Sequence, residues 1–267
     1  MTGGSGQAEG DNLTDSQRQF SQVAEAYRQS PTHADPVSLA RFLTLAELRP
    51  NHRVLDVATG TGNVALAAAP RVSEVVGLDI TAQMLAHAKA LAAEREIRNV
   101  TFLRGDAEQL PFPGGSFDRV LVRSAPHHFK QLIPALSEAY RVLRPGGVFA
   151  VSDCSPPPVV RDWLEVVEIG RDPSHVRSRA LEEWRALLSS LGFTVEHAER
   201  IEQEKDILAW FALAKLPDKR QRRLLDYYES APQAVRGQLL AQWREGRLYH
   251  RYWHALIRAR RPIQPLS

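Results

Sequence analysis

Apolar positions follow two different periods along the chain, and the period changes near residue 53. Before it, apolar residues recur at helical spacing, with Phe20, Val23 and Tyr27 on one stripe and a second helix starting at Pro36. After it, short apolar runs alternate with segments of helical spacing. We therefore predict N-terminal helices at 13–50, followed by alternating strands and helices.

The alternating part of the chain has the pattern of a parallel sheet flanked by helices. Its predicted elements are strand 53–57, helix 63–69, strand 74–78, helix 82–94, strands 100–103 and 117–122, helix 132–143 and strand 147–152. Helices that connect parallel strands pack on the two faces of the sheet. The sequence thus predicts an α/β, Rossmann-like fold with a core at 51–153.

Beyond the core the alternation breaks, and we expect the C-terminal half of the sheet at 154–267 to carry two additions. A proline-rich and polar stretch at 154–178 is a candidate lid segment. After a helix at 180–191 and a strand from Phe193, a charge-rich helical insert is expected at 206–244, before a final strand at 249–257. An insert between two neighbouring strands is a second lid candidate.

Composition narrows the class of protein without identifying it. The 267 residues are 43% hydrophobic and 24% charged, and no apolar run approaches the roughly 20 residues that span a bilayer. We expect residues 1–12 to be a disordered tail. The single cysteine, Cys154, excludes an internal disulfide framework and a thiolate-rich metal site, so we expect no metal and a cytoplasmic location. The net charge of +3 is spread along helices, which does not indicate a nucleic-acid partner.

A glycine loop follows the first predicted strand of the core. The segment Gly60-Thr-Gly-Asn-Val-Ala65 fits a variant of the dinucleotide fingerprint, so the glycines alone do not decide the ligand. Asp56 precedes it at the end of the strand, where a carboxylate would repel a pyrophosphate. The amino group of S-adenosylmethionine is positively charged and would be attracted. The sequence therefore favours S-adenosylmethionine over a nicotinamide cofactor.

Two more carboxylates follow the next two strands. Asp79 ends the second strand, where a carboxylate can accept hydrogen bonds from both ribose hydroxyls. Asp106 follows the third strand in Gly105-Asp-Ala-Glu108 and is placed to meet the adenine amino group. Any one of these acids can be a cap or turn residue, but three in register at one sheet edge indicate a nucleoside site.

Four motifs resemble those of a known family. They are Val54-Leu-Asp-Val-Ala-Thr-Gly-Thr-Gly62, Val76-Gly-Leu-Asp-Ile80, Gly105-Asp-Ala-Glu-Gln-Leu-Pro-Phe-Pro113 with Ser116-Phe-Asp118, and Arg141-Val-Leu-Arg-Pro-Gly-Gly147. Between about residues 20 and 151 the chain resembles class I methyltransferases that use S-adenosylmethionine and release S-adenosylhomocysteine. Within them it is most similar to the branch of the ubiquinone and menaquinone C-methyltransferases.

The resemblance implies a seven-stranded sheet of order 3-2-1-4-5-7-6 with its last strand antiparallel. It also implies which residues contact the methionine, ribose and adenine parts of the donor. Together with Tyr27 as a cover and Arg123 and Ser124 as further contacts, the expected donor-binding residues are Tyr27, Asp56, Ala58, Thr59, Gly60, Gly62, Asp79, Ile80, Met84, Gly105, Asp106, Ala107, Arg123 and Ser124. Met84 is more typical of helix packing beside the ribose than of a specific contact. Ala58 departs from the family, where many members carry glycine.

The fourth strand ends in a pair of histidines at the position where class I enzymes face the methyl carbon. Alignment of the acceptor can lower the barrier of a displacement reaction by about 7–11 kcal/mol. A base that removes the acceptor's proton is the second requirement. Histidine is suited to take a proton near neutrality. His128 is the candidate base and His127 the alternate, although both are also typical of a helix start. His33, His128 and His175 are the candidate acceptor-binding residues, with the helices at 13–50 covering the site.

The sequence thus predicts methyl transfer to oxygen or carbon of a small-molecule acceptor, phenolic or quinol-like. A donor-binding module without catalysis and a nicotinamide-dependent oxidoreductase are the alternatives. Nucleic-acid methylation is disfavoured, because no Asn-Pro-Pro-Tyr type segment follows the fourth strand. Arsenic methylation is disfavoured because one cysteine cannot form a trithiolate site.

Overall fold

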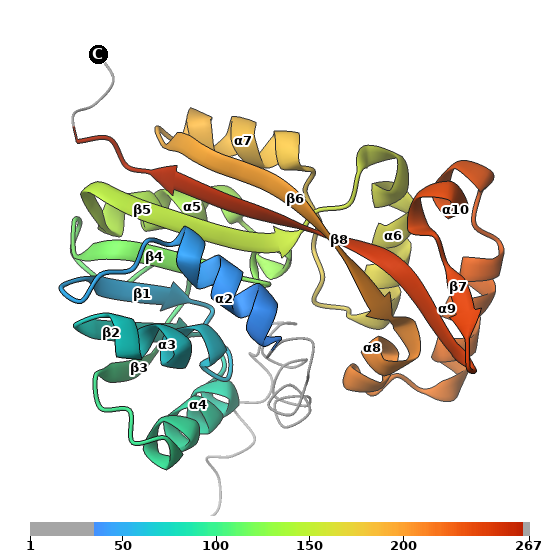
Figure 1. The fold of residues 1–267 in the computed structure, drawn as a ribbon, viewed down its shortest axis with the longest axis horizontal. Helices are drawn as coiled ribbons and strands as arrows, with labels where there is room; N and C mark the ends of the chain where they lie inside the picture. The colour runs from blue at the N-terminus through green and yellow to red at the C-terminus, as the bar shows by residue number, and fades with distance from the viewer. Residues whose placement is uncertain (1–34, 264–267) are drawn as a thin grey trace, which may run out of the picture.

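The computed structural model describes residues 35–263, and a mixed β-sheet is its central element (Figure 1). Its strands are β1 (Arg53–Val57), β2 (Glu74–Asp79), β3 (Val100–Arg104), β4 (Phe117–Arg123), β5 (Leu143–Cys154), β6 (Thr194–Asp206), β7 (Gln242–Arg244) and β8 (Arg247–Arg260). The strand order is β3-β2-β1-β4-β5-β8-β6, with β7 paired to β8.

The predicted order and direction of the seven long strands are confirmed. Strands β1 to β5 pair in parallel, and β8 is antiparallel to both β5 and β6. The three-residue strand β7 was not predicted and lies inside the expected helical insert. All three of its residues are exposed, so no apolar alternation marks it in the sequence.

Helices lie on both faces of the sheet, as predicted. They are α2 (Pro36–Leu45), α3 (Asn63–Ala68), α4 (Ala82–Glu94), α5 (Leu132–Val142), α6 (Pro158–Arg171), α7 (Leu181–Ser190), α8 (Ile207–Leu213), α9 (Asp218–Glu229) and α10 (Gln233–Leu239), with 3-10 turns η1 (Ala69–Arg71) and η2 (Pro126–His128). The predicted first helix, with Tyr27, and His33 lie outside the described residues. None of the described helices is long and apolar enough to cross a bilayer.

Helix α6 lies within the candidate lid segment 154–178, where no helix was predicted. Its buried residues Val160, Trp163, Leu164 and Val167 recur at helical spacing, which is the signal that the preceding prolines obscured. Proline at the first position of a helix is favourable, because its missing N–H would have no partner there. The proline run therefore starts a helix here.

Each face of the sheet has its own apolar core, because successive strand residues point to opposite faces. In β1, Leu55 and Val57 pack with residues of α5 and α7, whereas Val54 packs with residues of α2, α3 and α4. The polar residue between them, Asp56, is left at the carboxyl end of the strand. Packing on both faces thus holds the end of β1 rigidly in place.

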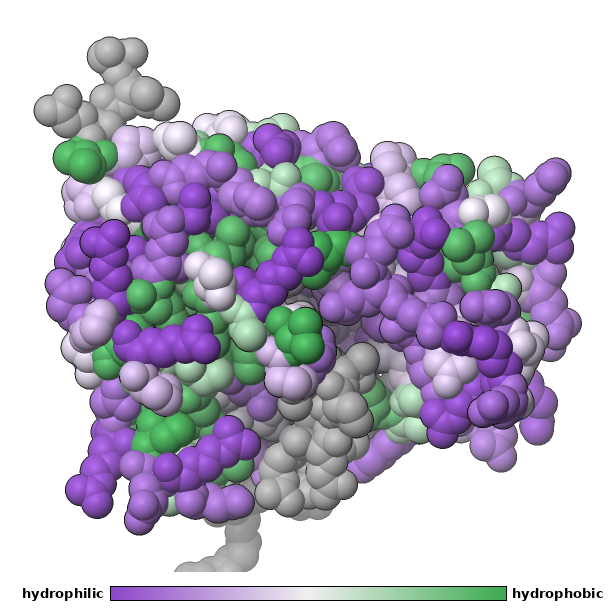
Figure 2. Space-filling view, viewed as in Figure 1, coloured by the Kyte–Doolittle hydropathy of each residue, from purple (hydrophilic) through white to green (hydrophobic). Residues whose placement is uncertain are grey.

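A third core joins α6, α8, α9 and α10 to the first half of β8. Strands β6 and β8 are much longer than predicted, and Figure 1 shows β8 running from the central sheet to the helical insert. The residues of β6 are exposed or half-buried throughout, so apolar alternation does not reveal its length. In Figure 2 hydrophilic side chains dominate the visible face over this helical part.

The glycine loop between β1 and α3 allows a test of close packing. Gly62 has φ +85°, and a Cβ built there lies 3.1 Å from Ala88 Cβ and 3.1 Å from Phe102 Cζ. We expect Gly62→Ala to lower the free energy of unfolding by about 1–3 kcal/mol. Gly237→Ala in α10, where nothing lies within 4 Å of the added Cβ, should raise it by up to about 1 kcal/mol. Urea denaturation of both variants measures the difference; equal effects would contradict the packing described.

Candidate donor and acceptor site

A cavity of about 320 Å³ opens at the carboxyl ends of the parallel strands. It lies where the strand order reverses between β1 and β4, the usual ligand position in open α/β sheets. Of the residues predicted to bind donor or acceptor, those lining it are Asp56, Ala58, Thr59, Gly60, Asp79, Ile80, Met84, Gly105, Asp106, Ala107, Arg123, Ser124 and His128. Gly62 lies behind them, at the start of α3.

Asp56 organises the loop between β1 and α3. Its Oδ2 accepts hydrogen bonds from Thr59 Oγ1 at 2.5 Å and from the Ala65 amide at 3.0 Å. The residue is 1% exposed, and burial raises its pKa to about 7. The charge of Arg123 acts to lower this pKa, but burial outweighs it. A ligand that brings a positive charge into the cavity would therefore stabilise the ionised form.

Asp79 and Asp106 lie at the ends of the neighbouring strands, in the same cavity. Asp79 Oδ2 accepts from the Gly60 amide at 2.8 Å, and its Oδ1 accepts from the Thr81 amide at 2.8 Å. Burial raises its pKa. Asp106 Oδ1 accepts from the Glu108 amide at 2.9 Å. Backbone amides thus orient the second and third carboxylates, which gives the wall of the cavity a fixed pattern of acceptors.

Two non-glycine residues in the cavity wall have left-handed backbone. Ala58 and Ser124 both have φ +54°. This region costs an L-residue about 1–2 kcal/mol, and such residues cluster at functional sites. A glycine at position 58 would adopt this conformation without that cost. The two strained positions end β1 and β4, on either side of the strand-order reversal.

Comparison with known proteins agrees with this geometry. Residues 54–147 match the family model described as a methyltransferase domain. The uncharacterized methyltransferase YcgJ of Bacillus subtilis is 35% identical over 219 residues, covering 81% of this chain and 87% of the relative. The chain belongs to the S-adenosylmethionine-dependent methyltransferases.

Two solved structures support the same family across the fold. The crystal structure of YcgJ superimposes with a TM-score of 0.80 at 32% identity, covering 84% of this chain and 98% of that one. A putative methyltransferase from Bacillus halodurans gives 0.79 at 34% identity, with the same coverage. A demethylmenaquinone methyltransferase of Thermus thermophilus is 41% identical over 145 residues, 52% of this chain and 66% of the relative.

The cavity fits the donor of this family. If S-adenosylmethionine binds here, the buried Asp56 carboxylate would hold its ammonium, and Asp79 and Asp106 would offer acceptors to its ribose and adenine. The sequence predicted these three carboxylates and the loop around them as donor contacts, and they line this one cavity. It did not reveal Asn63, Thr81 or Phe129, which also line the cavity.

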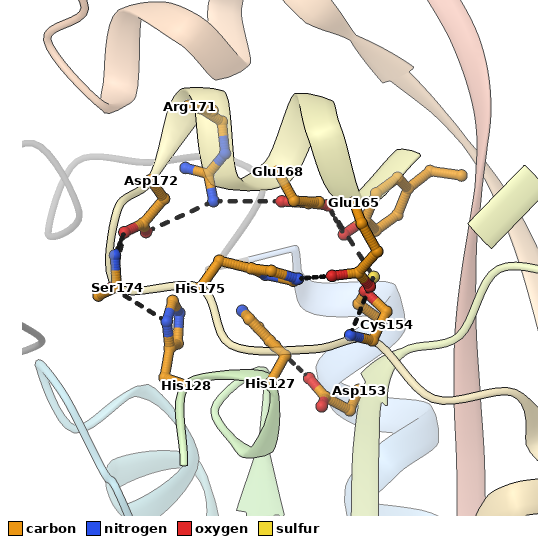
Figure 3. A network of polar contacts seen from close by, with 12 residues as sticks. His127, His128, Asp153, Cys154, Glu165, Glu168, Arg171, Asp172, Ser174 and His175 are labelled. Atoms are coloured by element: carbon orange, nitrogen blue, oxygen red, sulfur yellow. Dashed lines mark hydrogen bonds and ion pairs between the residues drawn. The ribbon is translucent and has the colours of Figure 1, made fainter. Parts of the chain in front are cut away.

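Beside the donor cavity of this methyltransferase, three histidines gather between η2 and the loop that follows α6 (Figure 3). The ring centroids of His127 and His128 are 4.1 Å apart, and those of His127 and His175 are 5.3 Å apart. The His127 carbonyl accepts from the amides of Val176 and Arg177, which ties the loop to η2. Histidines predicted from two segments distant in sequence, one in η2 and one after α6, thus lie side by side. Within the described part of the chain, no group of three His, Cys, Asp or Glu residues is arranged to hold a metal ion.

A chain of hydrogen bonds runs from Asp172 through Ser174 to His128. Ser174 Oγ donates to Asp172 Oδ1 at 2.6 Å and lies 3.0 Å from His128 Nδ1 (Figure 3). Because the hydroxyl proton is directed to the carboxylate, His128 Nδ1 is the donor to Ser174 and the lone pair of the neutral ring is on Nε2. Burial, followed by the charge of His127, lowers the pKa of His128, so the ring is neutral near pH 7.

The other two histidines have carboxylate partners of their own. His127 Nδ1 lies 2.5 Å from Asp153 Oδ1, where burial lowers the pKa of His127 to about 3 and raises that of Asp153 to about 7. His175 Nε2 lies 2.9 Å from Glu165 Oε2. These partners were missed in the sequence, although the Asp172-Pro-Ser-His175 turn that carries one histidine is a recognisable signal.

The raised pKa of Asp56 makes donor affinity dependent on pH. Below pH 7 the free carboxyl is increasingly protonated, which weakens its attraction for the donor's ammonium. We expect binding of S-adenosylmethionine to weaken about tenfold or more between pH 7.5 and 5.5. Calorimetry measures this, and Asp56→Asn should bind weakly at pH 7.5 with a flatter profile. A pH-independent affinity of the wild type would contradict this role for Asp56.

Proposed function

We propose that this methyltransferase transfers a methyl group to an oxygen or an activated carbon of a small-molecule acceptor, with His128 as the general base. The observation that carries the proposal is the hydrogen-bond chain Asp172–Ser174–His128, which ends on a ring in the wall of the donor cavity. A carboxylate that orients a histidine through a fixed hydrogen bond is a recurring arrangement for proton transfer.

Some residues of the site position the reactants, and His128 transfers the proton. When bound, S-adenosylmethionine supplies a methyl group attached to its sulfonium sulfur. The acceptor's nucleophilic atom bonds to the methyl carbon by in-line displacement, and S-adenosylhomocysteine is the leaving group. His128 Nε2 accepts the proton that the acceptor's O–H or C–H group gives up. Asp172 compensates the resulting imidazolium charge through Ser174. Burial lowers the pKa of His128 and weakens it as a base, whereas the charge of Asp172 acts to raise that pKa and favours proton uptake by the ring.

The cavity walls on the acceptor side favour a small polar acceptor over a long-chain quinol. His128 also lines a second, smaller cavity whose wall includes Glu168, Arg171 and Lys205. Charged residues in a confined wall are costly beside an apolar chain. His127 and His175 contact the base rather than the donor cavity, which supports a positioning role for them.

The proposal is tested by methyl transfer from S-adenosylmethionine to a panel of phenols, quinols and hydroxy acids. We expect His128→Asn to lower kcat by about 100-fold or more while the affinity for S-adenosylhomocysteine changes less than twofold. Ser174→Ala should give a smaller loss, because it removes the orientation of the ring and leaves the ring itself.

The matched control is His87→Asn in α4, which changes a histidine outside both cavities and should retain wild-type kcat. An unchanged kcat in His128→Asn would remove this residue as the base. Donor binding by the wild type with no transfer to any compound of the panel would instead favour a donor-binding module without catalysis.

A further inference from the structure

A second cavity of about 70 Å³ lies next to the donor cavity and shares Arg123, Ser124 and His128 with it. It is closed by residues of α6, α8, β6 and β8. Pockets for drug-sized ligands have volumes of about 300–1,000 Å³, so this space suits one small group of a larger molecule. A molecule that enters it past His128 would keep its remaining atoms at the donor cavity.

Lys205 is the cation that the cavity wall presents from β6. Gln203 and Lys205 are two residues apart in this strand and both line the cavity, as expected for side chains on one face. The Lys205 ammonium lies 3.1 Å from the centroid of the Tyr252 ring and 4.2 Å from that of Trp210. Two aromatic faces thus hold the ammonium in position.

Glu168, the carboxylate in the wall of this cavity, already has partners other than Lys205. Glu168 Oε1 accepts from the Tyr252 hydroxyl at 2.7 Å, and Glu168 Oε2 lies 3.5 Å from Arg171 Nη2. Among the residues described, no carboxylate lies at ion-pair distance from Lys205. Burial therefore lowers the pKa of Lys205 to about 7, although Glu168 and Cys154 act to raise it and Arg171 lowers it further. His250, opposite Lys205 on β8, is kept neutral by burial.

We propose that this second cavity binds a carboxylate of the methyl acceptor through Lys205, and that the acceptor is a small carboxylic acid. The inference rests on the function proposed above and adds the class of acceptor. Of the three cations in the cavity wall, Arg171 lies against Glu168, and Arg123 lies in the field of Asp35 and Asp56. The Lys205 ammonium is thus the charge that a singly charged carboxylate would match, whereas a doubly charged phosphate would keep an uncompensated charge. The carboxylate would hold the acceptor while its nucleophilic group lies beside His128.

The proposal is tested by calorimetry on the full chain saturated with S-adenosylhomocysteine. The probes are 4-hydroxybenzoate and glycolate, each paired with its neutral carboxamide, and 4-hydroxyphenyl phosphate. We expect at least one carboxylate to bind tenfold or more tightly than its amide and than the phosphate ester. Lys205→Met, which keeps an unbranched chain between the two rings, should abolish this preference and retain binding of S-adenosylhomocysteine. The control Lys89→Met, at an exposed lysine of α4, should keep the preference.

Proton uptake gives a second readout that a structural role of Lys205 would not produce. A bound carboxylate stabilises the ammonium, so at pH 8 binding should draw nearly one proton from the buffer. Titrations in two buffers of different ionisation enthalpy measure this number. Affinity for the carboxylate should fall about tenfold per pH unit above pH 7. Lys205→Met should show neither effect.

The outcomes of these experiments separate the carboxylate site from the proposed methyl transfer. A wild type without preference for the carboxylates, or a preference that Lys205→Met retains, overturns the inference. Tighter binding of the phosphate ester overturns the choice of carboxylate. Methyl transfer to neutral phenols at rates equal to those for the acids overturns the acceptor class and leaves the proposed transfer intact. Preferential binding of a carboxylate without transfer to any compound leaves the anion site intact and overturns the proposed function.

Discussion

The pairing of β8 with both of its neighbours is the constraint on which the rest of the molecule depends. Over one half of its length β8 lies between β5 and β6 in the central sheet, and over the other half it packs with α6, α8 and α10. One-residue slippage of a strand moves every side chain to the opposite face. The register that buries Ile257 in the sheet core therefore also places Tyr252 in the wall of the second cavity.

The site combines groups held in two different ways. The carboxylates Asp56 and Asp79 accept hydrogen bonds from amides of α3 and of the loops after β1 and β2, all near the carboxyl ends of these strands. The acceptor side is built from long-range contacts, such as those between His128 and Ser174 or between Tyr252 and Glu168. The wall proposed for the donor thus depends on backbone geometry close to the strand ends, whereas the wall proposed for the acceptor depends on how the additions to the sheet pack.

This difference explains how far the sequence alone could be interpreted. The succession of strands and helices and the carboxylates at the strand ends follow from local patterns, namely alternating elements, a glycine loop and an acid at each strand end. The strand order was implied by the resemblance to class I methyltransferases. Helix α6 was missed because prolines suggested an irregular segment, and the length of β6 was missed because its residues are neither buried nor alternating. Long-range contacts determine the roles proposed for Asp153, Asp172 and Lys205, and the spacing of apolar residues does not reveal such contacts.

The loop after α6 is fastened to η2 through main-chain atoms, since the His127 carbonyl accepts from the amides of Val176 and Arg177. Backbone hydrogen bonds of this kind do not depend on the identity of the loop's side chains. The side chains of Val176 and Arg177 can therefore change during evolution while the loop keeps its place beside the cavity. The surroundings of the three histidines can thus diverge by substitution alone, without redesign of the fold.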